Sequence, residues 1–259
     1  MRFVFDLDGT IVFKGKPVCK VISDALLGLQ KDGHEVIFAS ARPIRDMLPV
    51  LDERFHTSYL IGGNGSLTSD GGRIVRVCSF TDQQKEKLLS LIAKYRAAYL
   101  IDSEWDYAYT GSPDHFLVKQ IDPLKTAKKT AASELPSFVK VLITEADDLE
   151  AMAKELSVED MVIHRHAGEG IIDISPPDIH KWSALEHLPS ASKSFVAFGN
   201  DTNDVTLFCH ASHAVMVGSH PELAKYADEV IALDGHEQKH IAQKINELSK
   251  QYAPADICL

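Results

Sequence analysis

Short apolar runs alternate with helical patterns near the start of the chain and again after Pro176-Pro177. Phe3–Phe5 is strand-like, Val18–Gln30 has helical spacing and stops near Gly33, and Glu35–Ser40 is again strand-like. This rhythm is typical of βαβ units and of a parallel sheet. We therefore predict an α/β fold with a Rossmann-like parallel-sheet core.

The middle of the chain follows a different pattern. Helical spacing over 82–95, a strand over 139–144 and a second helix over 145–156 precede two β-rich halves around an Ala-Gly-Glu-Gly turn. Those halves predict a hairpin over 161–175. We expect residues 1–79 and 177–259 to form the α/β core and residues 80–176 to form an inserted α+β domain.

Charge and apolar runs argue against several classes of partner. The formal net charge of -10 is spread along 259 residues, and no Lys/Arg stripe is present to neutralise nucleic-acid phosphates. No run approaches the ~18 apolar residues of a membrane span, and no charged leader precedes Phe3. The cysteines are scattered singly, which indicates neither a zinc site nor disulfides. We expect a cytoplasmic monomer or homodimer that binds neither nucleic acid nor membrane.

Two carboxylates follow the first apolar strand. In "FVFDLDGTI" the strand ends at Asp6, Asp8 follows two residues later, and Gly9 permits a tight turn. Carboxylates so close repel each other unless a cation or a shared proton relieves them. The pair therefore indicates a bound metal or a division of acid and base roles, although an Asx turn would explain one Asp alone.

Three further segments carry polar residues at the ends of apolar runs. Ser40, followed by Ala41 and Arg42, ends a strand, and "GNDTND" (199–204) follows another. Lys181 opens a helix, where the helix dipole disfavours a cation. Each segment alone has a structural explanation as a cap, a turn or a solvated residue. In an open parallel sheet, however, functional groups gather beyond the carboxyl ends of the strands, so we predict one shared site.

These segments resemble the four motifs of the haloacid dehalogenase (HAD) phosphohydrolase superfamily, in the family's order. "DLDGT" is similar to the first motif, "ASAR" to the second, Lys181 to the third and "GNDTND" to the acidic fourth motif. The "NG" before a Gly-rich hairpin and the segment "IIDISPPDIHKWSAL" resemble the Cof-like branch. In that branch a large α/β cap lies between the second and third motifs, which implies that residues 80–176 are such a cap.

The resemblance implies a Mg²⁺-dependent phosphatase. Asp6 would attack phosphorus and form an aspartyl phosphate, and Asp8 would act as general acid and base. Mg²⁺ prefers hard oxygen ligands. The implied phosphate-binding residues are Gly9, Ser40, Ala41, Lys181 and Asn203, and the implied metal ligands are Asp6, Asp8, Asn200, Asp201 and Asp204.

Two positions depart from the family pattern. Ala41 replaces a Gly, which matters little if only its amide is used. Asn200 stands where the family usually has Asp, so one negative charge is lost, although an amide oxygen can still ligate Mg²⁺. Asp204 and Asn200 are the first candidates for the metal shell, with Asp201 close behind, and the sequence leaves this choice open.

Substrate selection should depend on the cap, which must exclude water from the reaction. The candidate residues are His164, Arg165 and His166 beside the hairpin turn, Glu169 within it, and the aromatic group Trp105, Tyr107 and Tyr109. Alternating residues on one strand face are also common in packing.

We predict that the substrate is a small phosphorylated metabolite, with sugar phosphates as the first candidates. The alternatives are a phosphotransferase or sugar-phosphate mutase, and a protein that binds phosphorylated ligands with low activity because of Asn200. A phospho-accepting signalling module fits less well, since modules of that class lack the D-x-D-G-T motif and the inserted domain that this chain has.

Overall fold

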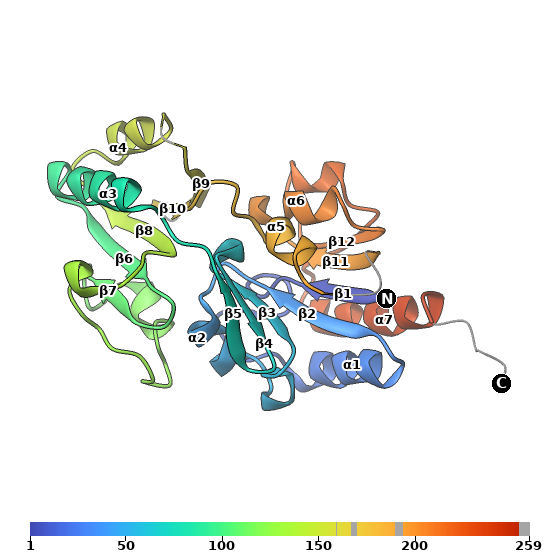
Figure 1. The fold of residues 1–259 in the computed structure, drawn as a ribbon. Helices are drawn as coiled ribbons and strands as arrows, with labels where there is room; N and C mark the ends of the chain where they lie inside the picture. The colour runs from blue at the N-terminus through green and yellow to red at the C-terminus, as the bar shows by residue number, and fades with distance from the viewer. Residues whose placement is uncertain (159, 167–169, 190–193, 254–259) are drawn as a thin grey trace.

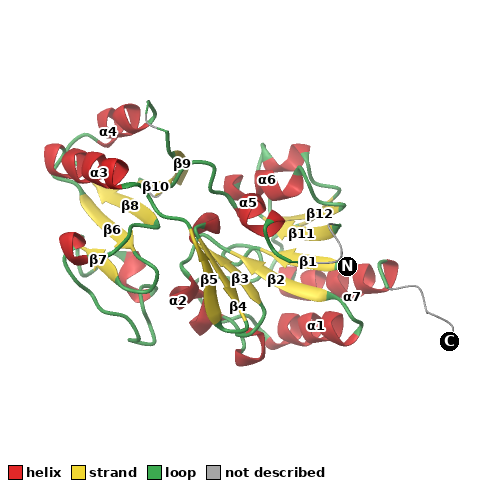
Figure 2. Cartoon of the chain, viewed as in Figure 1, coloured by secondary structure: helices red, strands yellow, loops and turns green. Residues whose placement is uncertain are grey.

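The computed structural model describes residues 1–158, 160–166, 170–189 and 194–253. In these ranges the strands form a first sheet in the order β13-β12-β11-β1-β2-β3-β4-β5 and a second sheet in the order β7-β6-β8-β10-β9. Each sheet has its own helices (Figures 1 and 2). The α/β class predicted from the sequence is confirmed.

The first sheet is built from both ends of the chain. Its strands are β1 (Arg2–Phe5), β2 (Glu35–Ala39), β3 (Tyr59–Gly62), β4 (Leu67–Asp70), β5 (Arg73–Val77), β11 (Phe195–Gly199), β12 (His213–Val217) and β13 (Glu229–Ile231). Its helices are α1 (Lys20–Lys31), α2 (Ile44–Met47), α5 (Lys181–Glu186), α6 (Val205–Phe208) and α7 (Glu237–Gln251). Neighbours from β13 to β3 are parallel, whereas β4 and β5 pair antiparallel.

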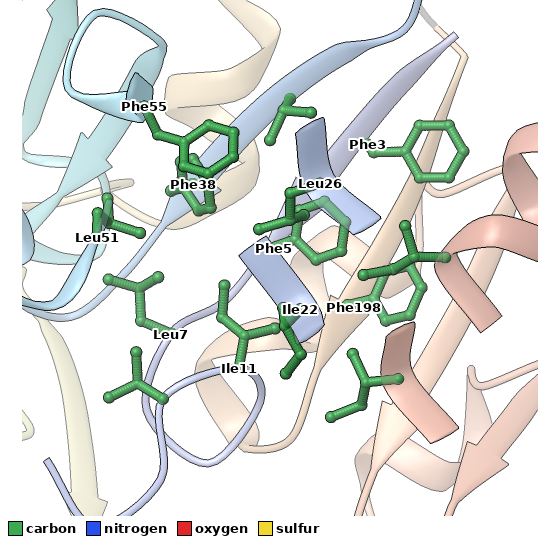
Figure 3. Packing of buried hydrophobic residues seen from close by; sticks show 14 of the residues in the cluster. Phe3, Phe5, Leu7, Ile11, Ile22, Leu26, Phe38, Leu51, Phe55 and Phe198 are labelled. Carbon is green, nitrogen blue, oxygen red and sulfur yellow. The ribbon is translucent and has the colours of Figure 1, made fainter. Parts of the chain in front are cut away.

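Helices cover both faces of the first sheet, because side chains along a strand alternate between its faces. Phe3 and Phe5 pack in the cluster that includes α1 and α7, and Val4 packs in the cluster that includes α5 and α6. Phe5 stacks on Phe198 of β11 with ring centroids 4.8 Å apart, close to Leu26 of α1 (Figure 3). The central strand β1 is therefore a rigid base for the residues that follow it.

Two helical segments beside the first sheet are very short. Around Pro49 the chain forms α2 and a 3-10 turn over Leu48–Val50, because proline cannot donate the backbone hydrogen bond of a helix interior. Between Pro221 and Tyr226 it forms a single 3-10 turn at Leu223–Lys225, since so short a segment gains little from helix propagation. None of the described helices is long and apolar enough to cross a membrane.

The second sheet is antiparallel and comes from the middle of the chain. Its strands are β6 (Ala98–Asp102), β7 (Tyr107–Tyr109), β8 (Lys140–Glu145), β9 (Val162–His166) and β10 (Ile171–Ser175), and its helices are α3 (Asp82–Lys94) and α4 (Leu149–Leu156). The expected β9–β10 hairpin pairs antiparallel as predicted. Both helices pack on one face, where Leu88 and Met152 contact the cluster around Val141. The opposite face contributes to a cavity beside the first sheet.

Candidate active site

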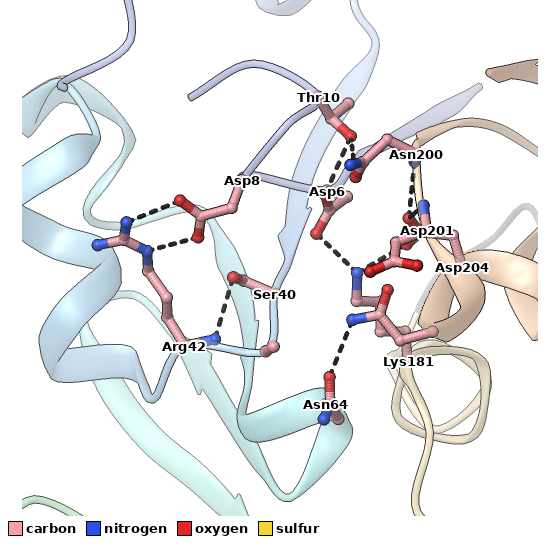
Figure 4. Close-up of polar contacts among 12 residues, drawn as sticks. Asp6, Asp8, Thr10, Ser40, Arg42, Asn64, Lys181, Asn200, Asp201 and Asp204 are labelled. Carbon is pink, nitrogen blue, oxygen red and sulfur yellow. Dashed lines mark hydrogen bonds and ion pairs between the residues drawn. The ribbon is translucent and has the colours of Figure 1, made fainter. Parts of the chain in front are cut away.

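Three segments that were predicted to meet do so at one edge of the first sheet (Figure 4). Asp6 follows β1, Ser40 follows β2, and Asn200 follows β11. The backbone N–H of Asp6 donates to the Phe198 carbonyl at 2.9 Å, so the start of the loop after β1 is held against β11. Lys181, the first residue of α5, extends into the same region.

Lys181 joins two carboxylates at the centre of the site. Its Nζ lies 2.6 Å from Asp6 Oδ1 and 2.6 Å from Asp204 Oδ1. Asp204 Oδ2 accepts the backbone N–H groups of Asn200 at 2.9 Å and Asp201 at 3.2 Å. Both carboxylate oxygens of Asp204 are therefore engaged within the protein. Asp201 is more exposed, and its Oδ1 accepts the backbone N–H of Thr202 at 2.7 Å.

The charges at this centre do not balance. Burial raises the pKa of Asp6 to about 7; the Asp204 and Asp8 carboxylates act in the same direction, and Lys181 opposes them. Although burial favours the neutral amine, the Asp204 and Asp6 carboxylates raise the pKa of Lys181, so its ammonium is charged. One ammonium beside two buried carboxylates leaves a net negative charge, and a further cation would favour the ionised form of Asp6.

The Asn200 amide faces three oxygens. One end of the amide lies 2.9 Å from Asp6 Oδ2, 3.0 Å from Thr10 Oγ1 and 3.0 Å from the Asp8 carbonyl oxygen. If that end is the nitrogen, it donates to these acceptors. If it is the oxygen, Thr10 alone can donate to it, and a cation would be needed to relieve the contacts with Asp6 and Asp8.

The same oxygens suit a magnesium ion. Adjacent ligands of an octahedral ion with bonds of about 2.1 Å lie about 3.0 Å apart. Asp6 Oδ2 and the Asp8 carbonyl lie at 2.9 and 3.0 Å from the Asn200 amide, so the three form a fitting set of hard ligands. No three His, Cys, Asp or Glu side chains are gathered as metal ligands in the described ranges, so such a site depends on carbonyl and amide oxygens.

Gly9 permits the close approach of Asn200. Its φ of +83° lies in the left-handed region, and a Cβ at this position would lie 2.2 Å from Asn200 Nδ2. Its N–H donates to the Val12 carbonyl at 2.9 Å, which closes the loop after β1. Any larger residue would displace Asn200 or the loop.

Arg42 binds Asp8 through two hydrogen bonds, a contact that the sequence did not predict. Arg42 Nε lies 2.6 Å from Asp8 Oδ2, and Nη2 lies 2.7 Å from Asp8 Oδ1. Nη2 also donates to Gln120 Oε1 at 3.1 Å, from the segment after β7. An arginine directly after a strand end that faces an acidic loop is the signal that could have indicated this pair.

A cavity of ≈ 340 Å³ lies between the two sheets. The predicted site residues that line it are Asp6, Asp8, Ser40, Ala41, Asn200, Asp201 and Asn203. Lys181 and Asp204 are fully buried and lie behind this surface. The second sheet contributes Leu100, Asp102, Lys140, Leu142, Ile171 and Asp173, none of which the sequence had singled out.

Polar contacts join the two walls of this cavity. Lys140 Nζ of β8 donates to the Ala41 carbonyl at 2.6 Å and lies 3.0 Å from Asp173 Oδ2 of β10. Asn64 Nδ2 donates to the same Asp173 oxygen at 3.1 Å, and Asn203 Nδ2 donates to Asn64 Oδ1 at 3.1 Å. Asn203 is thus tied, through Asn64, to the second sheet.

The candidates proposed for substrate selection lie mostly elsewhere. His164 is on β9, the outermost strand of the second sheet, opposite Asp173, and its side chain does not line the cavity. The backbones of Arg165 and His166 pair with β10, whereas their side chains and all of Glu169 lie outside the described residues. Among the aromatic candidates, the Trp105 carbonyl accepts Arg45 Nη1 at 2.6 Å, Arg45 Cζ lies 5.0 Å from the Tyr107 ring centroid, and Tyr109 packs with Leu100.

The family model of haloacid dehalogenase-like hydrolases matches residues 3–245. The chain belongs to this family. An HMP-PP phosphatase of Yersinia pseudotuberculosis is 22% identical over 93% of both chains. The structure of a sugar phosphatase of HAD subclass IIB superposes with a TM-score of 0.78, at 16% identity, over 95% of this chain and 98% of that one. A haloacid dehalogenase-like hydrolase from B. subtilis superposes with a TM-score of 0.76, at 20% identity, over 95% and 99%. The family and the fold predicted from the sequence are confirmed.

Proposed function

We propose that this chain is a Mg²⁺-dependent phosphatase that hydrolyses small phosphate monoesters through an aspartyl phosphate on Asp6. The observation that carries the proposal is the environment of the Asp6 carboxylate, which lines the cavity while Lys181 and Thr10 hold its two oxygens. A carboxylate fixed in this way is oriented for in-line attack. The phosphatases among the relatives of the chain support phosphate esters as its substrates.

The residues around Asp6 supply the remaining steps. An Asp6 oxygen attacks phosphorus while the bond from phosphorus to the alcohol oxygen breaks, and Asp8 donates a proton to that oxygen. Water then attacks the aspartyl phosphate, Asp8 accepts its proton, and free Asp6 and inorganic phosphate result. Ser40, the Ala41 amide and Asn203 would bind phosphate oxygens, with the Lys181 charge behind Asp6.

Mg²⁺ would be held by Asp6 Oδ2, the Asp8 carbonyl and Asn200 Oδ1. When bound, the ion would neutralise charge on the nucleophile and on the transferring phosphoryl group. Asp204, whose oxygens are both engaged, would serve as the charge partner of Lys181. Asp201 lines the cavity and would complete the metal shell through water.

Residues 80–176 would act as the cap, because the second sheet supplies one wall of the cavity and separates the site from solvent. This arrangement selects the substrate through the alcohol part of the ester. The phosphoryl part would contact only the first sheet and its loops.

Phosphate release from p-nitrophenyl phosphate tests the proposal. Purified protein should release phosphate only with Mg²⁺, and Asp6→Asn should lower the rate at least about a thousandfold, since it removes the nucleophile. Asp52→Asn, at a surface carboxylate paired with Arg54, is the matched control and should retain the wild-type rate. An unchanged rate in Asp6→Asn would refute the assignment.

Asn200 favours one alternative, a protein that binds phosphate monoesters with little turnover. Calorimetry that shows tight binding of a phosphate ester without release of inorganic phosphate would support this alternative. Transfer of labelled phosphate to a second sugar in place of water would instead support a phosphotransferase.

A further inference from the structure

The wall that the second sheet gives to the cavity has an apolar centre. Leu100 of β6, Leu142 of β8 and Ile171 of β10 all line the cavity, and Leu100 lies directly opposite Leu142 in the ladder. The three side chains belong to one cluster against which Leu117 and Ile121 also pack. This face of the sheet therefore offers an apolar surface from three adjacent strands.

The segment after β7 extends the same surface toward solvent. Phe116, Leu117 and Ile121 line the cavity. Phe116 is 44% exposed, which places it at the rim, whereas Leu117 and Ile121 are only partly exposed. Six apolar side chains thus line the cavity, beside polar residues such as Gln120, Lys140 and Asp173.

The polar groups of this wall are largely engaged by other groups of the protein. Lys140 is bound to Asp173 and to the Ala41 carbonyl, and Asp102 Oδ1 accepts Arg45 Nη2 at 2.9 Å. Asp102 Oδ2 is a buried acceptor without a hydrogen-bond partner among the described residues. A ligand with many hydroxyl groups would find few free partners here, and each hydroxyl that lost water without replacement would weaken its binding.

The size of the cavity limits the alcohol as well. Its volume of ≈ 340 Å³ is near the lower end of the ~300–1,000 Å³ typical of ligand sites. Part of that space must hold the phosphoryl group beside Asp6 and Ser40. The remainder suits a compact group of about one ring.

We propose that the enzyme prefers phosphate monoesters of compact, mainly apolar primary alcohols, such as arylmethyl alcohols, over phosphates of polyhydroxylated sugars. The inference rests on the proposed function and specifies its substrate class. Apolar surface of the alcohol is buried against Leu100, Leu142 and Ile171, which favours binding in proportion to the area removed from water.

Benzyl phosphate and glucose 6-phosphate are the matched probes, because both are phosphates of primary alcohols. With Mg²⁺ we expect kcat/KM for benzyl phosphate to exceed that for glucose 6-phosphate at least about tenfold, the discrimination that one apolar pocket typically provides. A ratio at or below one would overturn the inference. p-Nitrophenyl phosphate serves as the common reference: if it is not hydrolysed, the proposed function itself is wrong, whereas hydrolysis of it with the ratio reversed refutes only the substrate class.

Variants of two neighbouring residues distinguish a loss of apolar contact with the substrate from a general disturbance of the structure. Leu117→Asn places an amide in the wall and should lower the benzyl-to-glucose ratio at least about tenfold. Val118→Asn is the matched control, since Val118 packs against the same cluster without lining the cavity, and it should leave the ratio unchanged. If Leu117→Asn does not fold, Phe116→Ala at the exposed rim should lower the ratio in the same direction. Equal ratios in the wild type and in whichever wall variant folds would count against the apolar wall.

Discussion

Asn200 would determine how much negative charge surrounds the proposed metal ion. An aspartate at this position would add a full charge, whereas the amide can present either an oxygen to a cation or a nitrogen to Asp6 and the Asp8 carbonyl. In the second orientation the amide satisfies these oxygens without a metal. A metal ion at this site would therefore compete with an internal hydrogen-bonded arrangement.

Replacing this amide should tighten metal binding. We expect Asn200→Asp to lower the Kd for Mg²⁺ at least about tenfold, because an added charge pair at 4 Å is worth about 4 kcal/mol at an effective dielectric constant of 20, and tenfold requires about 1.4 kcal/mol. Calorimetric titration with Mg²⁺ measures the effect directly, and Asp201→Asn is the companion variant. If the Kd for Mg²⁺ is unchanged in Asn200→Asp but higher in Asp201→Asn, Asp201 and not Asn200 is the ligand.

Gly9 can be tested against a glycine of similar conformation. Gly9 has φ +83° and Gly235 has φ +87°, but only at Gly9 would a Cβ meet other atoms within 4 Å. Gly235→Ala should therefore lose only the backbone term of about 1–2 kcal/mol, and Gly9→Ala should lose more because it displaces Asn200. Urea unfolding compares the two variants, and equal losses would show that the contact with Asn200 has no energetic effect.

At the scale of single elements, α5 matters because its first residue provides the buried cation. The His180 side chain accepts the backbone N–H of Ser183, and the Ser183 hydroxyl accepts that of His180, so the helix start is closed on itself. These two hydrogen bonds at the N-terminus of α5 fix the position of Lys181 between Asp6 and Asp204. A helix of six residues thus sets the charge balance of the whole site.

Removing that cation should destabilise the protein in a pH-dependent way. Lys181→Met leaves two buried carboxylates without their cation. Removal of one partner of a buried ion pair typically lowers the free energy of unfolding by about 3–5 kcal/mol, and we expect a loss of this size at neutral pH. The folded-state pKa of Asp6 is already raised to about 7 from 3.8, so the stability from its protonated form is present below about pH 4 and is lost as pH rises toward 7. Below about pH 7 Asp6 is protonated in both folded proteins, so both lose this stability equally. The variant raises this pKa further, so within a series from pH 4 to pH 9 its deficit should grow chiefly above about pH 7.

Unfolding free energies of wild type and Lys181→Met across this range provide the measurement. Lys20→Met is the control, because Lys20 pairs with Asp24 on the surface of α1. A deficit that is the same at every pH would mean that lost packing, not unpaired charge, causes the effect.

The sequence predicted elements well where local patterns were strong. The apolar run before "GNDTND" is β11, and the helical spacing from Lys181 is α5, so the meeting of Asp6, Lys181 and Asp204 followed from strand ends in a parallel sheet. The role of Arg42 did not follow, because its partner Asp8 is chosen by loop geometry. The cavity wall was also missed, because which strand of the second sheet lies outermost depends on nonlocal pairing. In the observed strand order β9 is outermost, so His164 does not line the cavity, whereas Leu142 of the central strand β8 does.

At the scale of the whole molecule, polar contacts close the space between two separate apolar cores. The core around β1 and the core below α3 and α4 are distinct clusters. Between them, Lys140 reaches the Ala41 carbonyl, and the Ser66 hydroxyl donates to the Val139 carbonyl at 2.7 Å. Interfaces of this polar kind permit relative motion of the units they join.

Breaking one of these contacts should open the molecule. Lys140→Met removes the hydrogen bond to Ala41 and the ion pair with Asp173, so we expect a larger radius of gyration in small-angle scattering and a higher KM for p-nitrophenyl phosphate. Lys119→Met, at an exposed lysine near the same cavity, should change neither. An unchanged radius and KM in Lys140→Met would show that other contacts hold the two sheets together.

The pairing of β1 with β11 also has a consequence for biosynthesis. Thr10 and Asn200 are hydrogen-bonded neighbours although they lie 190 positions apart. At translation rates of about 5–20 residues per second, β1 leaves the ribosome about 10–40 s before its partner strand is made. During that interval one edge of β1, whose residues are all buried in the folded chain, has no neighbour, and an unpaired edge of this kind promotes aggregation. We therefore expect the newly synthesised polypeptide to lack a complete site until β11 and the residues that follow it have been translated.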